Sequence, residues 1–193
     1  MTISKDDILL DNIKEALALY QRSLVWATTA ALSGLLIAIR LREPTPEPVP
    51  VLSGTLSAPV AWAIAQALYV VFGALAFSAI RRYLSALTAL NPSEDILQAI
   101  RLYPSLATLP GRFFPLGSVL VPPAATAASW TIELLREHSR SPPSDRSWWV
   151  GMFFTALVLL APYLGIGATL RELRQWSPLP SRTGKAAQTS GNE

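Results

Sequence analysis

The sequence predicts an all-α integral membrane protein, a helical bundle of four or three transmembrane helices with an N-terminal amphipathic helix. Two observations support this fold class. Only 15% of the 193 residues are charged, whereas 51% are hydrophobic. Four stretches also lack any ionisable side chain, and each is close to or above the length of about 20 residues that crosses a hydrocarbon core; they are residues 23–39, 48–80, 113–132 and 147–170. We expect one membrane domain over residues 1–175 and a disordered, Ser- and Pro-rich tail over residues 176–193.

The first helix is predicted to begin as an amphipathic segment over residues 5–22. Its apolar residues recur three and four positions apart, which places them on one face of a helix; they are Leu9, Ile13, Ala16, Leu17, Tyr20 and Leu24. Nothing in the following residues breaks a helix. We therefore expect it to continue directly into the first span, residues 23–41, and to end near Arg42.

A proline-rich connector separates the first span from the second. Four prolines within residues 43–50 remove amide donors and favour extended backbone, which predicts a stiff polyproline-like segment. The second span is predicted over residues 59–80 and begins at Pro59, because proline suits the first turn of a helix. Apolar spacing continues about two turns beyond Arg81 and Arg82, so we expect this extension to pack against the amphipathic helix.

The third apolar segment, residues 113–135, is compatible with two structures because Pro115, Pro122 and Pro123 interrupt it. In the first, the segment crosses the bilayer as a kinked helix whose freed carbonyls find donors on neighbouring groups. In the second, Pro122 and Pro123 start a helix that lies on the membrane surface. The first structure gives four spans and the second gives three.

The last span is predicted over residues 148–170. It begins at Trp148 and Trp149, and tryptophan is enriched where a membrane meets water. Pro162 lies inside this span and is expected to kink the helix, because proline removes a hydrogen bond and crowds the preceding turn.

The distribution of positive charge predicts the orientation, since cytoplasmic segments carry the excess of Lys and Arg. Four spans with both termini inside place all but five of the 16 basic residues on the inner side; the five are Arg40, Arg42, Arg136, Arg140 and Arg146. Three spans give a smaller excess. We expect a multi-pass protein of a bacterial inner (plasma) membrane with a cytoplasmic N-terminus, the bacterial source being inferred from the preference for Arg over Lys.

Catalytic chemistry has little support in the sequence. The chain has no cysteine and one histidine, His138. The uncharged spans offer no proton acceptor or charged metal ligand, which membrane enzymes and ion-coupled carriers usually need. We therefore predict no catalytic residue, no cofactor and no metal site. Because the basic residues are scattered, nucleic acid is not an expected partner either.

The candidate site residues are polar or small side chains within the spans. Gln66 and Thr155 are candidate polar contacts, either as interhelical hydrogen bonds or as groups that line a path or touch a substrate. Small residues four positions apart let helix backbones approach closely; these pairs are Ala30 with Gly34, Ala74 with Ser78, and Ala161 with Gly165. These pairs are compatible either with helix packing within one subunit or with helix packing between subunits.

Three functions are compatible with these observations. The favoured one is a non-enzymatic membrane subunit that self-associates or docks a partner through cytoplasmic helices, residues 5–22 and 83–101. The second is an oligomeric pore or transport component whose path is lined by Gln66, Ser78 and Thr155. The third is a membrane enzyme that acts at the lipid headgroup level through His138. The expected partners are the lipid bilayer and either further copies of the chain or another protein of a membrane complex.

Overall fold

The computed structural model describes residues 5–40, 49–51, 54–90, 100, 114–140 and 146–175. Its elements are α1 (Lys5–Arg40), β1 (Val49–Val51), β2 (Gly54–Leu56), α2 (Ala58–Leu90), α4 (Phe114–Arg140) and α5 (Arg146–Gln175). The predicted helical fold class is confirmed for these residues, apart from two strands of three residues each. Three helices, α1, α2 and α5, are long and apolar enough to cross a membrane. The tail predicted over residues 176–193 lies outside the described residues.

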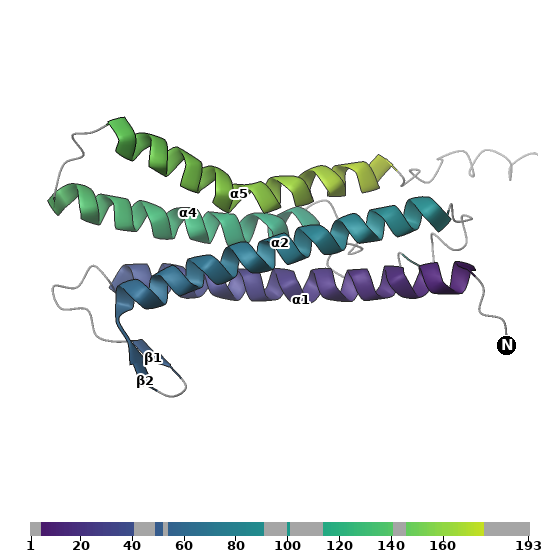
Figure 1. Cartoon of the computed structure of the whole chain (residues 1–193), viewed down its shortest axis with the longest axis horizontal. Helices are drawn as coiled ribbons and strands as arrows, with labels where there is room; N and C mark the ends of the chain where they lie inside the picture. Colours follow the sequence, from purple (N-terminus) through teal and green to yellow (C-terminus); the bar gives the residue numbers. More distant parts are fainter. Residues whose placement is uncertain are drawn as a thin grey trace, which may run out of the picture.

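The four helices run side by side, and successive helices point in opposite directions (Figure 1). Helix α1 packs against α2 and α4, and α5 packs against the same two helices. The order around the bundle is therefore α1, α2, α5, α4. The N-terminal end of α1 and the C-terminal end of α5 lie at one end of the bundle, while the β1–β2 hairpin lies at the other.

Helix α1 is continuous through the amphipathic segment and the uncharged run that follows it. Its buried face includes Ile13, Leu17 and Tyr20, each at most 2% exposed. The end of α2 supplies the buried residues Tyr83 and Leu87 to the same core. Burial of this face stabilises the two helix extensions against each other, because apolar area removed from water contributes about 25 cal/mol per Å².

Alanine is the commonest buried residue on both α1 and α2, which pack against each other. Small side chains let the two backbones approach closely, which favours dispersion contacts where water is absent; the buried alanines are Ala16, Ala27, Ala30, Ala31 and Ala38 on α1 and Ala58, Ala61, Ala65, Ala76 and Ala79 on α2. This is the most extensive helix contact in the described structure.

The last residues of the connector between α1 and α2 form a strand, and the sequence predicts a polyproline-like conformation for them. Residues 49–50 were expected in a polyproline-like segment, but Val49–Val51 forms β1 and pairs antiparallel with β2, with Pro50 opposite Thr55. The rest of the expected segment, residues 43–48, lies outside the described residues. Proline is tolerated here because each strand of a two-stranded ribbon is an edge strand, which leaves one side free of ladder hydrogen bonds.

Prolines interrupt neither α4 nor α5. Helix α4 begins at Phe114 and continues through Pro122 and Pro123, so it does not start at that pair, as one of the two sequence alternatives supposed. Helix α5 contains Pro162 and bends near its middle (Figure 1). Each internal proline leaves the carbonyl four residues earlier without its helical donor.

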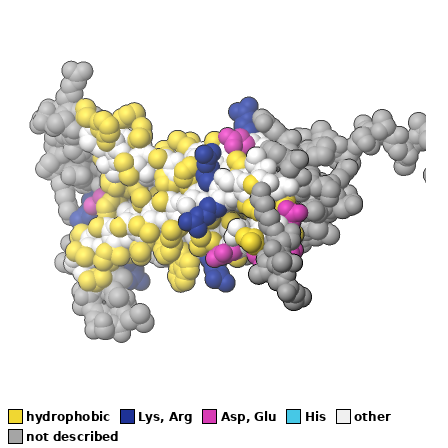
Figure 2. Space-filling view, turned by 45° about the vertical axis from the view of Figure 1, so that its right-hand side comes forward, with side chains coloured by type: hydrophobic (Ala, Val, Ile, Leu, Met, Phe, Trp, Pro, Cys, Tyr) yellow, Lys and Arg dark blue, Asp and Glu magenta, His cyan; other side chains and the backbone are white. Residues whose placement is uncertain are grey.

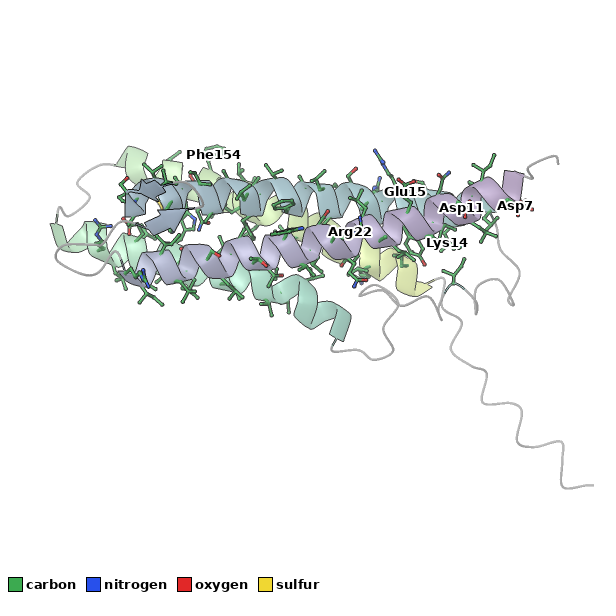
Figure 3. The ribbon with its side chains drawn as sticks, turned by 90° about the horizontal axis from the view of Figure 1, so that it is seen from below. Asp7, Asp11, Lys14, Glu15, Arg22 and Phe154 are labelled. Atoms are coloured by element: carbon green, nitrogen blue, oxygen red, sulfur yellow. The ribbon has the colours of Figure 1, made fainter. Side chains whose placement is uncertain are left out.

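Charged side chains lie on one or both sides of an uncharged length in each of the described helices. The five charged residues labelled in Figure 3 lie along the N-terminal half of α1, and no further charge follows Arg22 until Arg40. A space-filling view shows apolar side chains over one part of the surface, bounded by Lys and Arg (Figure 2). The uncharged lengths of the helices correspond to about 25–36 Å at 1.5 Å per residue, comparable with a hydrocarbon core of about 30 Å.

Many large apolar side chains of the described helices are exposed. Leu36, Phe153 and Leu164, on α1 and α5, are 64%, 65% and 70% exposed. Soluble monomers rarely expose contiguous apolar patches of this kind. The bundle is therefore apolar outside as well as inside.

Candidate functional site

A buried hydrogen-bond network joins α1, α2 and α4. Ser129 of α4 is fully buried, and its Oγ accepts a hydrogen bond from Trp62 Nε1 at 2.7 Å and donates one to the Gly34 carbonyl at 3.3 Å. Gln66 Nε2 donates to the same oxygen at 3.5 Å. Gln66, a candidate from the sequence, therefore lies in a polar contact between helices. Such contacts satisfy polar groups where water is absent.

Three buried tyrosines come together near the middle of the bundle, one each from α1, α2 and α5. The rings of Tyr69 and Tyr163 are stacked, with centroids 5.0 Å apart and planes 10° apart. The Tyr69 hydroxyl donates to the Leu159 carbonyl at 3.1 Å, in the turn of α5 that precedes Pro162. The hydroxyls of Tyr20 and Tyr163 are buried without a hydrogen-bond partner. This layer fills the centre of the bundle with aromatic rings.

Glycines on α2 and α5 provide space for aromatic rings from the opposite helix. A Cβ placed on Gly73 would lie 3.0 Å from the Tyr163 ring, and one placed on Gly165 would lie 2.6 Å from the Phe77 ring. Each helix therefore inserts a ring over a glycine of the other. Gly34 has the same role on α1, where its Cβ would lie 2.6 Å from Gln66 Nε2.

The small residues proposed from the sequence have different environments. Ala30 and Gly34 are buried on α1, and Gly165 lies beneath Phe77. The other three are exposed on the outer surface of the bundle: Ala74, Ser78 and Ala161. Only the first three therefore contribute to close packing inside the bundle.

A cleft lies between α4 and the first half of α5, where α5 bends away at Pro162. It has a volume of about 200 Å³, and Tyr69 of α2 also lines it. Its lining is almost entirely apolar, with Leu134, Met152 and Leu159 among the contributors. Thr155, the second polar candidate, lines the cleft while its hydroxyl donates to the Gly151 carbonyl of its own helix at 2.9 Å.

Two polar atoms of cleft-lining residues have no hydrogen-bond partner. Thr126 is 2% exposed, and neither its Oγ1 nor Trp130 Nε1 has a partner. Trp130 packs edge-on against Trp62, with ring centroids 5.0 Å apart. Buried donors are normally paired, so two unpaired donors beside one cavity are unusual.

A larger groove of about 780 Å³ lies between the N-terminal half of α1 and the C-terminal half of α2. Apolar side chains such as Leu9, Leu19 and Phe77 line it together with Glu15 and polar or charged residues of α2. Among the latter are Arg81 and Arg82, whose guanidinium groups form no ion pair within the described residues. The groove thus combines an apolar lining with two unpaired positive charges.

Sequence reasoning missed the residues that organise the interior. Ser129, Trp62 and Tyr163 are polar or aromatic residues inside uncharged runs. The available signal was their helical phase, because each lies on the same face as buried alanines or leucines. Periodicity cannot say which side chains of different helices meet, so the network required the structure.

The charged residues do not form a metal site in the part of the chain that the structure describes. The side chain of His138, used in the enzyme hypothesis, lies outside the described side chains. Comparisons of the chain with protein-family models, with curated proteins and with solved structures found no match.

Proposed function

We propose that this protein is a non-enzymatic, multi-pass subunit of a membrane complex. It docks a partner helix at the end of the bundle that holds the N-terminal end of α1 and the C-terminal end of α5. The proposed membrane domain has four spans, with α4 crossing beside α1 and α5. Its support is the arrangement of α4, which lies alongside three helices that are apolar enough to cross a membrane. By the distribution of positive charge, the docking end is cytoplasmic.

The groove between α1 and α2 is the observation that carries the docking proposal. Its apolar lining suits the apolar face of an amphipathic helix, a common way for one helix to recognise another. Arg81 and Arg82 would then meet acidic residues of that helix. The well-packed α1–α2 contact beneath the groove keeps both walls in place, which reduces the entropy lost on binding.

The buried polar groups support a structural role for the interior. The Ser129 network and the Tyr69 hydrogen bond join helices, while aromatic rings occupy the middle of the bundle. A path for ions or solutes would have to run between subunits. For this reason docking is preferred to the pore as the proposed function.

Site-specific photo-crosslinking in cells tests the docking proposal. Asn12 lines the groove, whereas Lys14 lies two residues away, is also exposed and does not line it. A photo-reactive amino acid at Asn12 should give a discrete adduct, and one at Lys14 should not. The mass of the adduct distinguishes a second 20.9 kDa copy from another protein.

Charge reversal supplies the second arm of this experiment. Arg81→Glu with Arg82→Glu should abolish the Asn12 adduct, because acidic residues of the partner would then be repelled. Equal crosslinking from Asn12 and Lys14, or an adduct that is unaffected by charge reversal, would contradict groove docking.

A further inference from the structure

We propose that the cleft between α4 and α5 is a binding site for an acyl chain of a membrane lipid whose ester carbonyl accepts a hydrogen bond from Thr126 or Trp130. This inference rests on the membrane placement proposed above. It concerns the opposite side of the bundle from the docking groove, and the two sites share no residues.

The volume and lining of the cleft define the apolar part of the ligand. Its 200 Å³ exceeds the roughly 150 Å³ of an engineered apolar cavity that binds benzene. Leu160, which lines the cleft, is 40% exposed. In a bilayer this surface faces hydrocarbon, so a lipid chain is the apolar molecule at highest local concentration.

The unpaired donors define the polar part of the ligand. Thr126 Oγ1 and Trp130 Nε1 both lack partners, and both residues line the cleft. Both donor atoms are buried, so the Thr126 hydroxyl reaches a ligand by rotation about χ1, for which Thr has two helical rotamers. An acceptor without a charge suits these neutral donors, and an ester carbonyl provides one.

Of the two donors, Trp130 lies nearer the depth of a lipid ester. Trp130 lies one turn before the Glu133–Arg136 ion pair, where α4 reaches its charged end. Thr126 lies a further turn inwards, and Tyr69 lines the cleft from α2. A lipid carbonyl bound by Trp130 lies towards the charged end of α4, and its chain runs along Leu159 and Leu160 towards the centre of the bundle.

Native mass spectrometry of the delipidated full chain in micelles tests the inference. The probes are dioleoyl phosphatidylcholine and its ether-linked analogue, which has the same chains and no carbonyl. The wild-type chain should retain the ester lipid about three- to tenfold more tightly, the range of one ordinary hydrogen bond. The double variant Thr126→Val/Trp130→Phe removes both donors and keeps apolar side chains at both positions, so it should bind both lipids equally.

A blocking variant tests the location. Ala127 is exposed and lines the cleft, so Ala127→Phe should remove binding of both lipids without crowding the core. Ala74→Phe is the matched control, because Ala74 is exposed on α2 away from the cleft. It should leave binding unchanged.

Several outcomes would overturn the inference. Equal retention of ester and ether lipids by the wild-type chain would remove the role of the donors. Unchanged lipid binding by Ala127→Phe would place the lipid elsewhere, and stronger retention of a prenylquinone than of either phosphatidylcholine would identify a different ligand. If the protein inserts in membranes but the lipid experiments give these contrary outcomes, the proposed membrane role stands and the lipid site does not.

Discussion

The α1–α2 hairpin and the α4–α5 pair are both antiparallel helix pairs, yet they are held together differently. The first pair makes the more extensive contact and buries many alanines, and its helices contain no proline after Pro59. The second pair contains internal prolines, meets over a smaller area and encloses the cleft. The difference indicates that the first hairpin is the scaffold and that the second pair retains the space in which we propose that a lipid chain binds.

Loss of a large core side chain from the scaffold should have the largest effect. Leu17 is fully buried, and Leu17→Ala should lower the free energy of unfolding by about 2–5 kcal/mol through lost burial and a new cavity. Leu160→Ala, at the cleft, should cost less than about 1 kcal/mol because Leu160 is already 40% exposed. Unfolding in mixed micelles measures both changes, and equal losses would contradict the comparison.

Added volume should distinguish the two pairs in the same way. Ala27 is fully buried on α1, so Ala27→Leu should destabilise by about 1–3 kcal/mol through overpacking. Ala127→Leu extends into the cleft and should change stability by less than about 0.5 kcal/mol. Thermal unfolding of the two variants, side by side, measures the difference. A well-tolerated Ala27→Leu would show that the first contact is looser than described.

The Tyr69 hydroxyl tests the link between the scaffold and the bend of α5. Tyr69→Phe removes its hydrogen bond to the Leu159 carbonyl and should cost about 0.5–1.5 kcal/mol. Tyr20→Phe is the control, because the Tyr20 hydroxyl is buried without a partner and its removal should be neutral or stabilising. Chemical unfolding measures the stability of both variants. A Tyr20→Phe variant less stable than Tyr69→Phe would rule out the hydrogen bond between the Tyr69 hydroxyl and the Leu159 carbonyl.

Exposed charge on the scaffold should matter least. Lys14 and Asp11 form an ion pair 3.5 Å long with both side chains more than half exposed. Asp11→Asn should therefore change the free energy of unfolding by at most about 0.5 kcal/mol, and the change should vanish in high salt. A loss above 1 kcal/mol that persists at 1 M salt would mean that Asp11 has another role.

The sequence was sufficient for the parts of the fold that depend on local composition. Apolar spacing indicated the helices, and Pro59 marked the start of α2 within one residue of Ala58. The two alternatives for residues 113–135 could not be separated, because internal prolines are compatible with both a kinked helix and a new helix start. Packing against α1 and α5 supplies the context that the local sequence lacks.

The candidate site was less accessible to sequence analysis. Gln66 was identified because an amide is costly inside an apolar run, but its partner Ser129 is 63 residues away. The β1–β2 pairing and the two unpaired donors at the cleft likewise depend on side chains or strands brought together by the fold. A single sequence contains no direct signal for such long-range pairs.

The central claim is that all four helices cross one membrane, and labelling of single cysteines tests it most directly. The chain has no cysteine, so Asn12, Ser57, Arg140 and Glu172 can each be replaced by cysteine and treated in intact cells with a membrane-impermeant maleimide. Ser57→Cys and Arg140→Cys should react from outside, whereas Asn12→Cys and Glu172→Cys should react only after permeabilisation. Protection at position 140 together with labelling at position 172 would show that α4 does not cross, and would contradict the four-span bundle.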